Sequence, residues 1–236
     1  MSDARINELR TNLAAVRERI DAAARAAGRE ENQVRLLPVT KFHPAEDLAH
    51  LLELGVTDVA ENREQEARGK AAVVPGIRIH MIGQIQSKKA NSVARWAAGV
   101  QSLDSVALAH GLDRGMALAL ERGDRTSEVL PCHLQLSADG DPARGGVTED
   151  DLDELADVVE AAGHLHLAGL MVVPPLDSRP ADIFARAREL CEHLEERFGR
   201  RMELSAGMSG DLEHAVAAGS DIVRVGTGVL GSRPVA

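Results

Sequence analysis

Aromatic side chains are almost missing from this 236-residue sequence, which has no tyrosine, one tryptophan and three phenylalanines. Without a phenol, a mechanism that needs a tyrosine as general acid or base is unavailable to a single chain. The scarcity of aromatic rings also removes the platforms on which single-stranded nucleic acids stack. Basic residues number 27 against 37 acidic ones, a net charge of −10, so we expect no nucleic-acid partner.

Cysteines and long apolar runs are scarce as well. Cys132 and Cys191 are the only cysteines, which supports neither a disulfide framework nor a cysteine zinc site. No apolar stretch reaches the ~20 residues that span a bilayer. The first thirty residues lack the apolar region of a signal peptide. We therefore expect a cytoplasmic protein with no membrane partner.

Strand-like and helix-like segments alternate along the chain, whose 44% hydrophobic and 27% charged residues are typical of a soluble globular protein. Residues 1–28 place apolar side chains at helical steps of three and four, and this helix ends at Gly28. The runs that resemble strands are 34–39, 57–60, 78–82, 99–103, 130–136, 165–173, 202–206 and 221–225. Helical patterns lie between them at 43–55, 62–73, 86–98, 105–121, 148–162, 178–198 and 209–218.

This alternation predicts parallel βαβ units. Eight such units in roughly 250 residues are typical of an α/β fold of the TIM-type (β/α)8 barrel class, with a doubly wound sheet as the alternative. The additional N-terminal helix, 1–28, would pack on the barrel and fill the last outer position. We expect a single domain over residues 1–236, with Thr148 and Ser209 as helix N-caps and Gly163 and Gly219 at helix ends.

Two glycine-rich loops follow the seventh and eighth predicted strands, where barrel enzymes frequently hold a phosphate. The first contains Ser205, Gly207, Ser209 and Gly210, and the second follows Arg224 with Gly226, Thr227 and Gly228. Small residues let the backbone curl so that its N–H groups can face an anion. Either loop alone could simply link two elements, but together, on adjacent strands, they predict a phosphate site.

Lys41 ends the first predicted strand, which adjoins the eighth in a closed barrel. A desolvated lysine forms Schiff bases with aldehydes, although most lysines at strand ends are only solvated surface charges. A lysine near a phosphate site leaves two ligands open, which are pyridoxal phosphate and a sugar phosphate bound as in an aldolase.

The remaining motifs favour structural interpretations. His164 and His166 share a strand face, but no acidic or cysteine partner stands at a metal-ligand spacing, so we predict no metal site. Cys132 and His133 point to opposite faces of a strand and cannot form a nucleophile pair easily. We interpret Lys88 with Lys89, and the acidic helix that follows Thr148, as solvated faces.

Five blocks of sequence resemble the pyridoxal phosphate homeostasis protein family. They are LLPVTKFHP (36–44), AENREQE (60–66), IHMIGQIQSKK (79–89), AGLMVVPP (168–175) and LSAGMSGDLEHAVAAGSDIVRVGTGVLGSR (204–233). They run in order across nearly the whole chain, and the last block is long and specific. Ala60, Arg63 and Lys88 stand where the family usually has glycine, an aromatic residue and asparagine.

The resemblance implies a barrel of the alanine-racemase fold type that binds pyridoxal 5′-phosphate (PLP) as a Schiff base on Lys41. It further implies that Arg224 faces the pyridine nitrogen and that Asn62 lies near the ring oxygen. His80 would pack near the cofactor. The residues expected around the phosphate are Ser205, Met208, Ser209, Gly226 and Thr227.

Two functions follow from the resemblance. The first is a non-catalytic protein of intracellular PLP homeostasis, which holds the cofactor and delivers or buffers it. The second is a PLP-dependent amino-acid racemase. The racemases use a tyrosine from an added domain, whereas this sequence has no tyrosine and its barrel consumes the chain. We therefore expect the carrier, a monomer with PLP and apo forms of PLP-dependent enzymes as its partners.

Overall fold

Helices and strands follow the predicted alternation closely in a computed structural model that describes residues 2–232. The strands are β1 (Arg35–Pro38), β2 (Asp58–Glu61), β3 (Arg78–Met81), β4 (Gly99–Leu103), β5 (Leu130–Leu136), β6 (Leu165–Val172), β7 (Glu203–Ser205) and β8 (Ile222–Val225). The α-helices are α1 (Ser2–Ala26), α2 (Ala45–Glu53), α3 (Glu64–Val73), α4 (Ala90–Trp96), α5 (Val106–Glu121), α6 (Leu152–Glu160), α7 (Pro180–Phe198), α8 (Leu212–Ala217) and α9 (Thr227–Leu230). Two short 3₁₀ turns are η1 (Ser87–Lys89) and η2 (Pro142–Arg144).

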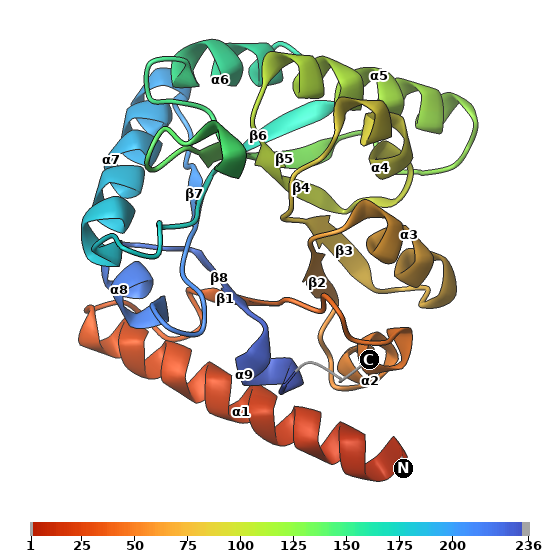
Figure 1. The fold of residues 1–236 in the computed structure, drawn as a ribbon, viewed down its shortest axis with the longest axis vertical. Helices are drawn as coiled ribbons and strands as arrows, with labels where there is room; N and C mark the ends of the chain where they lie inside the picture. Colours follow the sequence, from red (N-terminus) through yellow and green to blue (C-terminus); the bar gives the residue numbers. More distant parts are fainter. Residues whose placement is uncertain (1, 233–236) are drawn as a thin grey trace.

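The strands form one parallel sheet in the order β1-β8-β7-β6-β5-β4-β3-β2. Its edge strands meet through an isolated bridge between Val39 and Ala60, where the Thr40 N–H donates to the Ala60 carbonyl oxygen at 3.0 Å. The sheet therefore closes into a ring that the helices surround (Figure 1). The predicted TIM-type barrel is confirmed, and the doubly wound alternative is wrong.

The N-terminal helix α1 packs outside the barrel against α2, α8 and α9 (Figure 1). Its buried stripe comprises Leu9, Leu13, Val16 and Ile20, as the helical spacing predicts. Arg5 at one end donates to both Asp47 carboxylate oxygens at 2.9 and 2.6 Å and to the Leu230 carbonyl oxygen at 2.9 Å. Helix α1 thus lies outside the barrel beside β1 and β8, its first and last strands. Among residues 2–232, no helix has both the length and the apolar character needed to cross a bilayer.

Polar side chains fill part of the barrel interior, in contrast to its apolar outer layer. Successive residues of a strand point to opposite faces, so in a barrel every second residue points inward. Gln101, Ser205 and Arg224 lie on β4, β7 and β8 and are all buried. A small apolar cluster of Leu37, Val39, Ala60 and Ile222 lies apart from the main core. An interior of this kind can hold polar ligands at its ends.

Two predicted helix starts are wrong by a few residues. Helix α8 begins at Leu212 and its N-cap is Asp211 in place of Ser209. The Asp211 side chain instead accepts from the Met208 N–H at 2.6 Å, which closes a tight turn before the helix. Helix α6 begins after Asp151, whose N–H donates to the Thr148 hydroxyl at 3.3 Å across a preceding turn. Side-chain hydrogen bonds within turns compete with helix capping at both sites.

Gly169 on β6 occupies a position that only glycine fits. Its φ is +149°, and an ideal Cβ there would lie 1.9 Å from the Glu203 carbonyl oxygen on β7. A side chain would force these adjacent strands apart or distort the backbone.

We expect Gly169→Ala to lower the free energy of unfolding by about 3 kcal/mol, because the added methyl group meets backbone. Urea unfolding followed by circular dichroism measures this change. Gly163→Ala is the matched control, since no atom lies within 4 Å of its ideal Cβ. Equal stability of the two variants would contradict the close approach of β6 and β7.

Candidate functional site

Lys41 lies in the loop at the carboxyl end of β1. The strand ends at Pro38, one residue before the end of the predicted run 34–39, and Val39 then forms an isolated bridge to Ala60. Thr40 is fully buried, Lys41 is half-buried, and Phe42 is partly exposed with a φ of +69°. The backbone around Lys41 is therefore held in a specific and partly strained conformation.

A buried ion-pair network fixes this loop. The Lys70 Nζ donates to the Thr40 carbonyl oxygen at 2.8 Å, to Glu61 Oε1 at 2.5 Å and to Glu66 Oε1 at 2.7 Å. Glu66 Oε1 also accepts from the Phe42 N–H at 2.7 Å. Thr40, on one side of Lys41, therefore binds the Lys70 ammonium directly. Phe42, on the other side, is connected to it through Glu66.

Glu61 ends β2 inside this network. Burial raises the pKa of its carboxyl group, while hydrogen bonds from Lys70 and from the Thr40 hydroxyl at 2.6 Å oppose the rise. Its second oxygen, Oε2, is buried without a hydrogen-bond partner within residues 2–232. The network joins the loops after β1 and β2 at the point where the barrel closes.

Asn62 lies next to Glu61, on the loop that leads into α3. Gly83 packs against its backbone so closely that a Cβ on this glycine would lie 2.1 Å from the Asn62 carbonyl oxygen. Asn62 Oδ1 is buried and has no hydrogen-bond partner within the described residues. A buried amide oxygen without a partner is unfavourable, and a bound polar ligand would relieve it. The neighbouring Arg63 places its guanidinium carbon 5.2 Å from the centre of the Phe42 ring.

The loops after β7 and β8 lie side by side, as predicted. The Arg224 N–H donates to the Gly207 carbonyl oxygen at 2.9 Å, which ties β8 to the loop after β7. An ideal Cβ on Gly228 would lie 3.8 Å from Ser209 Oγ, so the two loops approach each other closely. Within residues 2–232, the hydroxyls of Ser209 and Thr227 make no hydrogen bond. Two accessible hydroxyls, with Met208 and Gly226 beside them, form a site suited to an oxyanion.

Arg224 and Ser205 lie beneath these loops in the barrel interior. Arg224 donates to Ser205 Oγ at 2.8 Å and to the Val172 carbonyl oxygen at 2.9 Å. Burial lowers the pKa of Arg224 to about 10, and the field of Asp211 opposes the fall, so the guanidinium stays charged at neutral pH. A buried cation whose hydrogen-bond acceptors are neutral is suited to an electron-rich ligand atom. The Ser205 hydroxyl is therefore already occupied by its hydrogen bond with Arg224.

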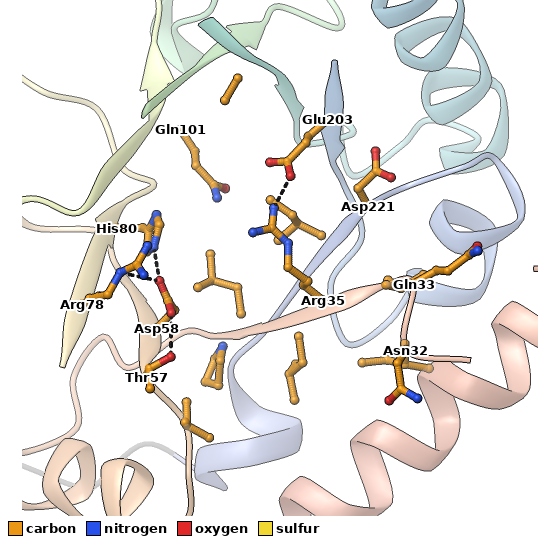
Figure 2. Close-up of a pocket in the computed structure, with 18 of the residues that line it drawn as sticks. Asn32, Gln33, Arg35, Thr57, Asp58, Arg78, His80, Gln101, Glu203 and Asp221 are labelled. Carbon is orange, nitrogen blue, oxygen red and sulfur yellow. Dashed lines mark hydrogen bonds and ion pairs between the residues drawn. The ribbon is translucent and has the colours of Figure 1, made fainter. Parts of the chain in front are cut away.

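His80 lies apart from the other eight predicted residues. Its ring faces the amino ends of the strands, where Nε2 lies 2.7 Å from Asp58 Oδ1 (Figure 2). Hydrogen bonds from His80 and Thr57 outweigh the effect of burial and hold the pKa of Asp58 below its usual range. His80 therefore belongs to a second cluster at the opposite end of the barrel.

This second cluster lines a pocket of about 1080 Å³ that the sequence analysis missed (Figure 2). Four of the eight strands begin with a charged residue that reaches it, namely Arg35, Asp58, Arg78 and Glu203. That pattern was the available signal, since a charge at an inward-facing strand start points into the barrel mouth. Within residues 2–232, no group of three or more histidine, cysteine, aspartate or glutamate residues could hold a metal ion.

Comparisons with known proteins agree with this geometry. Residues 11–234 match the family described as "Alanine racemase, N-terminal domain". The pyridoxal phosphate homeostasis protein of Corynebacterium glutamicum is 59% identical over 218 residues, which cover 92% of this chain and 99% of that protein. The Escherichia coli (strain K12) protein of the same name is 33% identical over 97% of this chain and 98% of its own length.

Solved structures support the same grouping. PipY, described as the COG0325 family member of Synechococcus elongatus PCC7942 with PLP bound, has a TM-score of 0.79 and 31% identity. The match covers 94% of this chain and 100% of PipY. Alanine racemase from Corynebacterium glutamicum shares the fold, with a TM-score of 0.67 and 15% identity over 98% of this chain and 62% of the racemase. The sequence and structural matches together show that this chain belongs to the pyridoxal phosphate homeostasis protein family.

Proposed function

We propose that this protein binds PLP at the carboxyl ends of its barrel strands and serves intracellular PLP homeostasis, as a cytoplasmic carrier, without catalysing a reaction. The observation that supports the proposal is that the loops with Lys41, Asn62, Ser209 and Thr227 follow the carboxyl ends of β1, β2, β7 and β8, which are neighbours in the closed sheet, with Arg224 on β8. Membership of the homeostasis family supports it, and so does the PLP that the relative PipY is described as binding.

PLP, when bound, supplies an aldehyde that condenses with a primary amine and a pyridine ring that withdraws electrons. In the proposed site, the Lys41 Nζ would supply the primary amine that holds the aldehyde covalently, with water as the product released. The lysine must be unprotonated to attack the carbonyl carbon. The network around Lys70 holds the Lys41 backbone in place, so the Lys41 amine is attached to a loop of fixed conformation.

The phosphate and the ring have separate partners in this proposal. Ser209 and Thr227 donate to the phosphate from their hydroxyl groups, and Met208 and Gly226 flank them. Asn62 lies on the β2 side, where its amide group can bind the ring oxygen. Ser205 acts through Arg224, because its hydroxyl is already hydrogen-bonded to the guanidinium.

Arg224 supports a carrier more than an enzyme. Its guanidinium stays protonated, so a pyridine nitrogen that faces it receives a hydrogen bond but no proton. The unprotonated ring stabilises a carbanion poorly, which weakens the chemistry that a racemase needs. The sequence also has no tyrosine to serve as a second acid or base. The racemase alternative would be favoured if the purified protein interconverted amino-acid enantiomers at a rate dependent on PLP.

We expect Lys41→Ala to abolish the near-ultraviolet and visible absorption of the Schiff base, because the attacking amine is lost. The fold should survive, since Lys41 lies in a half-buried loop outside the core. A PLP titration followed by absorbance, with circular dichroism as the fold check, measures both effects. Lys88→Ala is the control because Lys88 is an exposed residue of η1. Undiminished Schiff-base absorption in Lys41→Ala would contradict the assignment of Lys41.

We expect Glu66→Ala to weaken PLP binding about tenfold, because it releases the Phe42 N–H from its carboxylate. A charge-assisted hydrogen bond contributes about 1.5–3 kcal/mol, and 1.4 kcal/mol corresponds to tenfold in affinity. Glu64→Ala is the matched control on the same helical turn, since Glu64 pairs with Ser92 and Lys89 on another side. Equal PLP affinity of the two variants would show that the network does not position Lys41.

We expect Arg224→Gln to shift the absorption maximum of bound PLP and to speed its release, because the pyridine nitrogen loses a cationic donor. Glutamine keeps a donor for Ser205, so the barrel interior is disturbed less than by alanine. Absorbance spectra and dilution-induced release measure the two effects. Arg197→Gln, on the exposed face of α7, serves as the control. An unchanged spectrum and release rate would place Arg224 away from the ring.

A further inference from the structure

The pocket at the amino ends of the strands lies at the opposite end of the barrel from the loops after β7 and β8. Its walls carry five arginines against four carboxylates, whereas the whole chain has a net charge of −10. Arg35 from β1 lies beside Glu203 in this pocket, and Arg78 from β3 lies beside Asp58 and His80 (Figure 2). The pocket is therefore a locally cationic hollow in an acidic protein.

Both mouth arginines are oriented by carboxylates and keep donors for a ligand. Arg35 Nη2 lies 2.6 Å from Glu203 Oε1, and Arg78 Nε lies 3.2 Å from Asp58 Oδ1. A guanidinium has five N–H donors, so one such contact leaves others available. The two side chains are 60% and 62% exposed, which keeps these donors accessible.

Two buried polar side chains, His133 and Gln101, line the inner wall of the pocket. His133 is only 5% exposed, and its Nε2 makes no hydrogen bond within residues 2–232, although Glu203 Oε2 lies 3.3 Å away. Burial lowers the pKa of His133, and the neighbouring Glu203 carboxylate opposes the fall. Gln101, almost completely buried, also lines the pocket and turns its amide toward the cavity (Figure 2).

A chain of hydrogen bonds connects this inner wall to the other end of the barrel. The Ser205 hydroxyl donates to Gln101 Oε1 at 2.8 Å and accepts from Arg224 Nη1 at 2.8 Å. The Gln101 amide therefore touches both the pocket and the group that orients Arg224. A ligand that moves Gln101 would change the environment of Arg224.

We propose that this pocket binds the oxyanion group, phosphate or carboxylate, of a small molecule between Arg35 and Arg78. The coupling of its occupancy to the cofactor end, through Gln101 and Ser205, rests on the proposed function, whereas the oxyanion site itself does not. Binding at either end then changes affinity at the other by the same factor.

The test is calorimetric titration of the PLP-loaded protein with inorganic phosphate, because PLP already occupies the site formed by Ser209 and Thr227. We expect one phosphate per chain and at least tenfold weaker binding in the double variant Arg35→Gln/Arg78→Gln. The control is Arg186→Gln/Arg197→Gln, which removes two exposed, ion-paired arginines of α7. No phosphate binding, or equal loss in both double variants, would overturn the proposal.

Two further arms separate the possible outcomes. Succinate replaces phosphate in the first, and tighter binding of one probe identifies the ligand as a carboxylate or a phosphate ester. The second arm titrates the unloaded protein and its Ser209→Ala/Thr227→Val variant. If PLP fails to bind but Arg35→Gln/Arg78→Gln still weakens phosphate binding in this arm, the proposed function fails while the pocket site stands.

The coupling has its own readout, which is the absorption spectrum of bound PLP during the phosphate titration. We expect the spectrum to shift with the same midpoint as the heat, and to stay constant in Arg35→Gln/Arg78→Gln. Phosphate binding without any spectral change in the wild-type protein would contradict the coupling through Gln101 and Ser205.

Discussion

Closure of the barrel between β1 and β2 is the constraint on which the candidate site depends. The strands meet at Val39 and Ala60, and immediately beyond that bridge the buried Lys70 ammonium ties the two following loops together. An ion pair with so little access to water needs further hydrogen bonds, and Thr40 supplies one to Glu61 Oε1 while Glu66 accepts one from Lys70. The same contacts that close the ring therefore fix the backbone of the loop that carries Lys41.

Inward-facing residues at successive levels of a strand serve the two ends of the barrel interior. On β7, Glu203 points to the amino-end pocket, while Ser205, two residues later, reaches Arg224. Gln101 on β4 faces Ser205 across the barrel and forms the connection between the two ends. A barrel interior filled by apolar side chains would separate its two mouths, whereas this one joins them by hydrogen bonds. The buried charge of Arg224 explains why the interior needs these polar neighbours.

Much of the fold could be predicted from the sequence, because hydrophobic periodicity and glycine positions are local signals. All eight predicted strands exist, and the loops with Ser209 and Thr227 do lie side by side. The predictions were wrong where a side chain has several possible hydrogen-bond partners. The N-cap of α8, for example, is Asp211 and not the predicted Ser209. The orientation of His80 and the amino-end pocket depend on the inward or outward register of each strand. That register is fixed only when the sheet closes.

We propose that one lysine, held at the closure of the barrel, is the attachment point for PLP. The sequence contains only four lysines, so the claim can be tested by reducing the PLP-treated protein with borohydride and mapping the modified peptide by mass spectrometry. We predict one phosphopyridoxyl group per chain, on the peptide that contains Lys41. Modification spread over Lys70, Lys88 and Lys89, or no added mass at all, would contradict the account.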